Sequence, residues 1–385
     1  MAVMIAGELG DKTFETKKRK LLLEDEQTIK KKVNLELERM EDTEIKVKIF
    51  PILGDEYFRP VETEKMFVGK VNVKKETSRL IKELSSHWPL TSRFHLKRVR
   101  GTQQKDISEI LIRPVELNES NESYSLASVL GEAQINTTGL MDSVAIYEVP
   151  KYPALTYDQY KVAKEFWPVQ FREDKRIEKS LKDDLFNLEE RKRIIEFMKM
   201  CLSVGQYGDE KVGCVIVDPV TSKLIAVAHD QRDLHPIQHA VMGAVDLVAR
   251  SQGGGSWDIT SKHVYHLHFS KEEMDSKITE IKKMNPGKDA KKMYLPYLCT
   301  GYDAYVSREP CVMCSMALVH SRIRRVFYVH KSPWGALGSQ CKLHIQEGLN
   351  HHYEVFRLEL EDSVQNCKES KMINCEGKPN CNSDS

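Results

Sequence analysis

The sequence predicts a layered α/β domain in its C-terminal half and a smaller α+β domain before it. In the C-terminal half, hydrophobic periodicity indicates two strands, a helix, a strand, a second helix and further strands in that order. In the N-terminal half, strand-like alternation surrounds one helical stretch. Charge separates two regions there: residues 65–105 hold eleven Lys or Arg against two acids, whereas residues 106–150 hold eight acids against one base. The smaller domain is therefore expected to carry a basic face.

Composition favours an intracellular globular protein with no membrane segment. The 385 residues are 41% apolar and 30% charged, with a formal net charge of +1. No stretch approaches the roughly 18 consecutive apolar residues that a membrane span needs. The first apolar run is short and broken by acids, so it does not resemble a secretory signal. Nine cysteines, an odd number, favour reduced thiols and a metal site over a disulfide framework.

The N-terminal part divides into three segments. Residues 1–43 are charged and lack apolar periodicity, which predicts a flexible leader; its KKRK run is either a nuclear address or solvated surface. We expect a basic α+β domain over residues 44–116, and a linker with an aromatic, proline-rich packing arm over residues 117–184. In the basic domain, strands are predicted at 44–50, 67–73, 94–99 and 109–115, and a helix at 76–86.

The layered domain is expected over residues 185–360. An amphipathic helix at 188–205 begins it, and a glycine- and lysine-rich insertion at about 253–292 interrupts it. Residues 361–385 are polar and are expected to be a disordered tail. Strands are predicted at 213–219, 223–230, 302–309, 323–329 and 353–360, further helices at 236–250 and 310–320, and a short helix between 340 and 348.

Three side chains of this domain form a candidate zinc site. The segment EPCVMC places Cys311 and Cys314 on the first turn of a helix, where a C-x-x-C spacing directs two sulfurs to one position and the helix N-terminus favours thiolates. His239 lies on the first turns of another helix. One imidazole and two thiolates supply three ligands of a tetrahedral Zn²⁺ site. Taken singly, His239 also fits a core histidine and the cysteines fit buried thiols, but the joint pattern favours the metal.

The position two residues after His239 argues against catalysis. Zinc deaminases of nucleobases carry H-x-E followed by P-C-x-x-C, and the glutamate transfers protons without binding the metal. Here Val241 replaces the glutamate. General acid–base assistance is worth about 10²–10⁴-fold in rate, and valine has no ionisable atom. Glu309 is the nearest acid in sequence, and we expect it to anchor the strand-to-helix turn. The sequence therefore predicts no catalytic residue.

At these residues the chain resembles the cytidine/tRNA-adenosine deaminase superfamily, and more narrowly the non-catalytic third subunits of eukaryotic adenosine deaminases acting on tRNA. The resemblance rests on QHAVM (238–242), the long stretch 297–328 and GALGS (335–339). It implies a three-layer cytidine-deaminase-like fold, with a central mixed sheet flanked by helices. It also implies zinc at His239, Cys311 and Cys314, and a heterodimer with a catalytic subunit that keeps H-A-E. The complex would convert the wobble adenosine of tRNA anticodons to inosine.

The basic block of the N-terminal domain agrees with a role in tRNA binding. Its cations would contact phosphates, and nearby aromatic rings would stack on bases. The alternative is an ordinary solvated face. The cations assigned to RNA contacts are Lys70, Lys74, Lys75, Arg93, Lys97, Arg98 and Arg100.

We interpret the chain as a zinc-containing, tRNA-binding subunit that is silent on its own and works in the nucleus and cytoplasm. One alternative is an active zinc deaminase of a free nucleoside or nucleotide. The missing glutamate and the separate basic domain argue against it, because small substrates need no such domain. The other alternative is a stand-alone RNA-binding protein with structural zinc, which a monomeric state in cell extract would favour.

Overall fold

A computed structural model describes residues 47–104, 106–116, 124–252, 254–257 and 297–360, which form two compact units. Among the described residues, the larger unit comprises residues 47–52 and those from Phe186 to 360, and the smaller unit comprises those within Leu53–Leu185. No helix in these ranges is both long and apolar enough to cross a membrane. The expected leader, most of the expected insertion and the expected tail lie outside the described residues.

The larger unit is built on a six-stranded mixed sheet with the strand order β1-β10-β9-β8-β6-β7. Its three central strands β10, β9 and β8 are parallel, and every other pairing is antiparallel. The strands are β1 (Val47–Pro51), β6 (Gly213–Asp218), β7 (Lys223–His229), β8 (Asp303–Arg308), β9 (Arg325–His330) and β10 (Glu354–Leu360).

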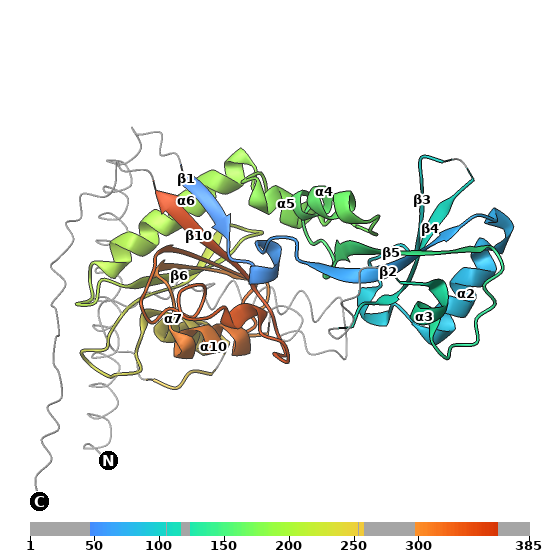
Figure 1. The fold of residues 1–385 in the computed structure, drawn as a ribbon. Helices are drawn as coiled ribbons and strands as arrows, with labels where there is room; N and C mark the ends of the chain where they lie inside the picture. Colours follow the sequence, from blue (N-terminus) through green and yellow to red (C-terminus); the bar gives the residue numbers. More distant parts are fainter. Residues whose placement is uncertain (1–46, 105, 117–123, 253, 258–296, 361–385) are drawn as a thin grey trace, which may run out of the picture. The chain divides into compact units, whose positions relative to one another are not determined.

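Helices cover both faces of this sheet (Figure 1). On one side lies α6 (Leu188–Gly205), whose Phe197 contacts Tyr305 of β8 with ring centroids 5.5 Å apart. On the other side, the next residue of β8, Val306, belongs to the core that α7 and α10 complete. These helices are α7 (Ala240–Ser251) and α10 (Val312–His320). The predicted three-layer fold with a central mixed sheet is confirmed. The short helix expected after residue 340 is the 3₁₀ turn η4 (Leu343–Ile345).

The smaller unit has a four-stranded antiparallel sheet with the order β3-β4-β2-β5 and a core on each face. Phe67 of β2 packs with α2 and α3, whereas its neighbours Met66 and Val68 pack with α4. The strands are β2 (Thr63–Val71), β3 (Val99–Gly101), β4 (Ser108–Pro114) and β5 (Leu140–Pro150). The helices are α2 (Thr77–His87), α3 (Leu126–Leu130), α4 (Tyr157–Phe166) and α5 (Lys175–Leu181), with 3₁₀ turns η1 (Asp55–Tyr57), η2 (Lys74–Glu76) and η3 (Thr91–Arg93).

The predicted basic domain at 44–116 has the wrong N-terminal boundary. Its first predicted strand exists as β1, but β1 pairs with β10 of the larger sheet, with Val47 opposite Leu360. An alternating apolar pattern predicts a half-buried strand and carries no information about its partner strand. The strand predicted at 94–99 is misplaced: residues 94–98 form a turn with an isolated bridge from Leu96 to Val169, and the strand β3 begins only at Val99.

The predicted linker and arm at 117–184 instead completes the smaller unit. β5 pairs with β2 along its length, from Thr63 opposite Pro150 to Val71 opposite Leu140. Most β5 side chains are half-buried or exposed because β5 is an edge strand, so its apolar alternation is weak. The arm contains α4, and Trp167 after it is buried in a core of the smaller unit. A capping box between Thr156 and Gln159 was the available signal for α4.

Candidate metal centre

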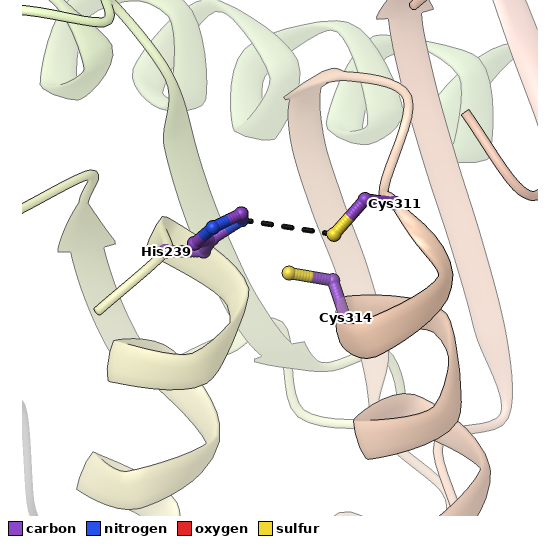
Figure 2. A group of neighbouring side chains, drawn as sticks. All are labelled: His239, Cys311 and Cys314. Carbon is purple, nitrogen blue, oxygen red and sulfur yellow. Dashed lines mark hydrogen bonds between the residues drawn. The ribbon is translucent and has the colours of Figure 1, made fainter. Parts of the chain in front are cut away.

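His239, Cys311 and Cys314 converge at the starts of two helices (Figure 2). His239 is the N-cap of α7 and Cys311 is the N-cap of α10, and each follows a strand of the central sheet. The three ligand atoms lie within 4.8 Å of one another, and the His239 Nδ1 to Cys311 Sγ distance is 3.7 Å. The predicted three-residue cluster is therefore present, because the sheet places both helix N-termini at the same edge.

The donor set fits a zinc ion. One imidazole nitrogen and two sulfurs match a tetrahedral site with a fourth position left for another ligand. The hydrogen bond from the Cys314 thiol lowers the pKa of Cys311 to about 5, so Cys311 is a thiolate at neutral pH. The same hydrogen bond raises the pKa of Cys314 well above its usual value, because it holds the proton on the Cys314 thiol; burial and the neighbouring Cys311 thiolate also disfavour a second negative charge. A dication would remove this conflict by binding both sulfurs as thiolates.

Val241 lies beside this cluster in a cavity of about 530 Å³. It is the second residue of α7, is only 2% exposed, and lines the cavity together with all three candidate ligands. The cavity is therefore large enough for a small molecule, since ligand pockets span roughly 300–1,000 Å³. At the position where the deaminase motif has its proton-transferring glutamate, this cavity has an aliphatic wall.

Glu309 is committed to holding a loop. It is 3% exposed, and its carboxylate accepts hydrogen bonds from the backbone N–H groups of Ser332, Leu337 and Ser339, and from the Ser339 hydroxyl. Glu309 was predicted to anchor the strand-to-helix turn, but its carboxylate instead anchors the 332–339 loop. Gly335 faces this carboxylate so closely that an added Cβ would lie 2.1 Å from its carbon. A carboxylate with four donors is poorly placed to act as a base for a cavity ligand.

A charged network lines the same cavity, and the sequence analysis did not identify it. Arg232 binds both Asp230, at 2.8 Å, and Glu210, at 3.0 Å. Arg308 also contacts Glu210, at 3.3 Å. The only available signal was proximity in the chain, because Arg308 directly precedes the E-P-C-x-x-C segment and Arg232 precedes the Q-H-A-V-M segment.

Of the cations assigned to RNA, two arginines have internal partners in the smaller unit. Arg93 forms two hydrogen bonds with the Glu64 carboxylate, at 2.6 and 2.7 Å. Arg98 is buried and donates to the backbone carbonyls of Trp88, at 2.5 Å, and Leu111, at 3.2 Å. Burial lowers the pKa of Arg98 to about 10. These guanidinium groups stabilise the fold.

Two further predicted cations are also paired. Arg100 donates to Glu109 at 2.6 Å and lies over the Trp167 ring, with its guanidinium carbon 4.3 Å from the ring centroid. Lys74 contacts Asp106 at 3.6 Å in an exposed pair. Hydrogen bonds within the smaller unit thus already occupy donors of Arg93, Arg98 and Arg100, which were predicted to contact RNA.

Three of the predicted cations remain available for a ligand. Within the described residues, the ammonium groups of Lys70, Lys75 and Lys97 have no carboxylate partner. Lys75 and Lys97 are exposed and Lys70 is half-buried. Lys97 lies on a well-fixed backbone, because its N–H donates to Pro168 and its carbonyl accepts from the Trp167 indole at 2.6 Å.

Comparison with known proteins gives two family matches. The model described as "Cytidine and deoxycytidylate deaminase zinc-binding region" matches residues 191–330, and "tRNA-specific adenosine deaminase TAD3 N-terminal domain" matches residues 64–167. The "Probable inactive tRNA-specific adenosine deaminase-like protein 3" of Danio rerio is 38% identical over 86% of this chain and 97% of its own length. The Homo sapiens protein of the same description is 37% identical over 82% and 90%. The "tRNA-specific adenosine deaminase subunit tad3" of Schizosaccharomyces pombe is 28% identical over 77% and 84%.

Proposed function

The chain belongs to the tRNA-specific adenosine deaminase-like protein 3 (TAD3) family, and from this membership we propose that it is the non-catalytic, zinc-binding and tRNA-binding subunit of a heterodimeric tRNA adenosine deaminase. Its partner is a catalytic deaminase subunit that carries H-A-E, and the complex converts the wobble adenosine of tRNA anticodons to inosine. The complex works in the nucleus and cytoplasm. One observation carries the silent role: Val241 lines the cavity that holds the three candidate zinc ligands.

The residues around the cavity favour a structural role in the complex over catalysis of deamination. Hydrolytic deamination needs a group that takes a proton from water and gives protons to the ring nitrogen and the departing ammonia. Val241 cannot hold a proton, and Glu309 is bound by four donors. Zinc held by His239, Cys311 and Cys314 would supply folding free energy. It would tie the first turn of α7 to the first turn of α10.

The silent role is tested by comparing the purified chain with the co-expressed complex. Inosine in a tRNA transcript is measured after digestion to nucleosides. The chain alone is expected to form inosine at least about 10²–10⁴-fold more slowly than the complex, because Val241 stands where the deaminase motif has its proton-transferring glutamate. Replacing the glutamate of the partner's H-A-E motif should abolish the activity of the complex. Inosine formation by the chain alone would instead identify an active deaminase, and a chain isolated from cells as a monomer would favour the stand-alone RNA-binding protein.

The proposed tRNA contact is tested on the three lysines that have no carboxylate partner. A chain with Lys70→Ala, Lys75→Ala and Lys97→Ala, in the complex, is expected to bind tRNA more weakly. The slope of log affinity against log salt should fall by about 1 for each lysine that contacts a phosphate. The matched control replaces the same three lysines with arginine, which keeps the charge and should keep the slope. A slope unchanged in the alanine variant would show that these lysines do not contact tRNA phosphates.

A further inference from the structure

Trp334 is a large aromatic residue left exposed on the rim of the cavity. Its exposed fraction is 77%, and it lines the cavity together with His239, Cys311 and Val241. Among the residues that the structure describes, its indole N–H has no hydrogen-bond partner and its ring packs on no other aromatic ring. The ring therefore contributes little to the core of the larger unit, and packing does not explain why a large aromatic side chain lies there.

The loop that carries Trp334 is held at several points. Glu309 accepts backbone hydrogen bonds from Ser332 before Trp334 and from Leu337 after it. The Gln340 side chain donates to the carbonyl of Pro333 at 2.7 Å, and the backbone N–H of Trp334 donates to the Ser332 hydroxyl at 3.3 Å. An aromatic ring on a loop with these restraints loses little backbone entropy when a ligand stacks on it.

The charges of the cavity leave one cation unpaired at this rim. The cavity is lined by three cations and three carboxylates: Arg232, Arg308, Lys331, Glu210, Asp230 and Glu309. Arg232 and Arg308 pair with Glu210 and Asp230, and Glu309 is satisfied by the loop. Lys331 is exposed and has no carboxylate partner within the described ranges, so its ammonium group is free for an anionic ligand.

We propose that this rim binds an unpaired nucleotide of the tRNA, with the base stacked on Trp334 and a phosphate at Lys331. The proposal rests on the function proposed above, and it adds an RNA contact on the larger unit. An aromatic ring beside a free cation is the combination that proteins use for unpaired nucleotides. The neighbouring cavity of about 530 Å³ gives a base room without a packing cost. The bound nucleotide would stay unchanged, because Val241 provides no proton transfer.

The contact is tested in the complex by tRNA affinity and by cross-linking. Stacking on an aromatic residue is worth about 1–3 kcal/mol per base, so Trp334→Ala should weaken tRNA binding about 5- to 150-fold. Trp334→Phe keeps a ring and should stay within about threefold of the original affinity. Lys331→Ala should weaken binding and lower the salt slope by about 1. Tyr297→Ala is the matched control, because Tyr297 is 71% exposed and does not line the cavity. It should leave the affinity unchanged. A tRNA containing 4-thiouridine should cross-link to the peptide that holds Trp334.

The results that would contradict the RNA contact differ from those that would contradict the proposed function. An unchanged affinity of Trp334→Ala in an intact complex that still forms inosine would overturn this contact and leave the proposed function standing. Loss of the heterodimer in Trp334→Ala, seen by native mass spectrometry, would show that the ring contacts the partner protein, and it would also overturn the RNA contact. Failure of the unmodified complex to form inosine would count against the proposed function itself.

Discussion

Replacing Cys314 with serine is expected to remove zinc from the chain and to destabilise the larger unit. The change keeps the side-chain volume nearly constant at a position that is 2% exposed, so packing loss is small. Structural zinc contributes about 10–16 kcal/mol in zinc-finger peptides. Because this unit also has a hydrophobic core of its own, we expect a smaller loss, on the order of 3–5 kcal/mol. At about 2–4 °C per kcal/mol, the melting temperature should fall by roughly 6–20 °C.

Cys214→Ser is the matched control for this prediction. Cys214 is also a buried thiol, 0% exposed, but it lies outside the three-residue cluster. Metal content measured by mass spectrometry should be one zinc per chain in the unmodified protein and in Cys214→Ser, and close to zero in Cys314→Ser. A chelator should lower the melting temperature of the first two proteins and leave the third unchanged. A correctly folded, unmodified chain that contains no zinc and ignores the chelator would contradict the metal site.

Removing Asp303 is expected to cost about 3–5 kcal/mol of unfolding free energy, since it leaves a buried charge without a partner. Asp303 is 0% exposed and Arg325 is 8% exposed, and their closest contact is 2.5 Å across the parallel pair β8 and β9. β8 leads directly into Glu309 and Cys311. The Asp303→Ala variant should therefore show a lower midpoint of urea unfolding and weaker retention of zinc.

Two comparisons isolate the buried charge as the cause. Adding Arg325→Met to Asp303→Ala removes the unpaired guanidinium and should recover part of the lost stability. Asp158→Ala breaks the exposed pair with Lys161, in which the side chains are 88% and 50% exposed, and should leave the urea midpoint nearly unchanged because solvent screens such a pair. Equal effects of Asp303→Ala and Asp158→Ala would show that burial of the Asp303–Arg325 pair carries no energetic weight.

Several features of the protein follow from short stretches of sequence. The C-x-x-C spacing, the histidine at a helix start and the order of strands and helices all depend on residues close together in the chain. Helix geometry alone puts Cys311 and Cys314 on one turn, and the sheet then places the start of α7, with His239, beside them. The absence of an ionisable group at Val241 is a property of residue type and needs no coordinates.

Other features depend on contacts between distant residues. Arg93 and Arg98 look like surface cations in sequence, but their partners Glu64 and Leu111 lie 29 and 13 residues away. The strand β1 carries the pattern of a half-buried strand, and only its pairing with β10, about 300 residues later, shows which sheet it joins.

The sequence by itself thus determines which metal-binding atoms the ligand cluster offers and that position 241 cannot transfer a proton, because both are properties of single side chains. Only the tertiary structure determines which Lys and Arg side chains have a carboxylate or carbonyl partner and which have none. A guanidinium or ammonium group changes its role when a distant carboxylate or carbonyl is brought within hydrogen-bonding distance. Trp334 shows the same dependence: its indole is exposed beside the cavity because Glu309, 25 residues earlier, fixes the loop on both sides of it.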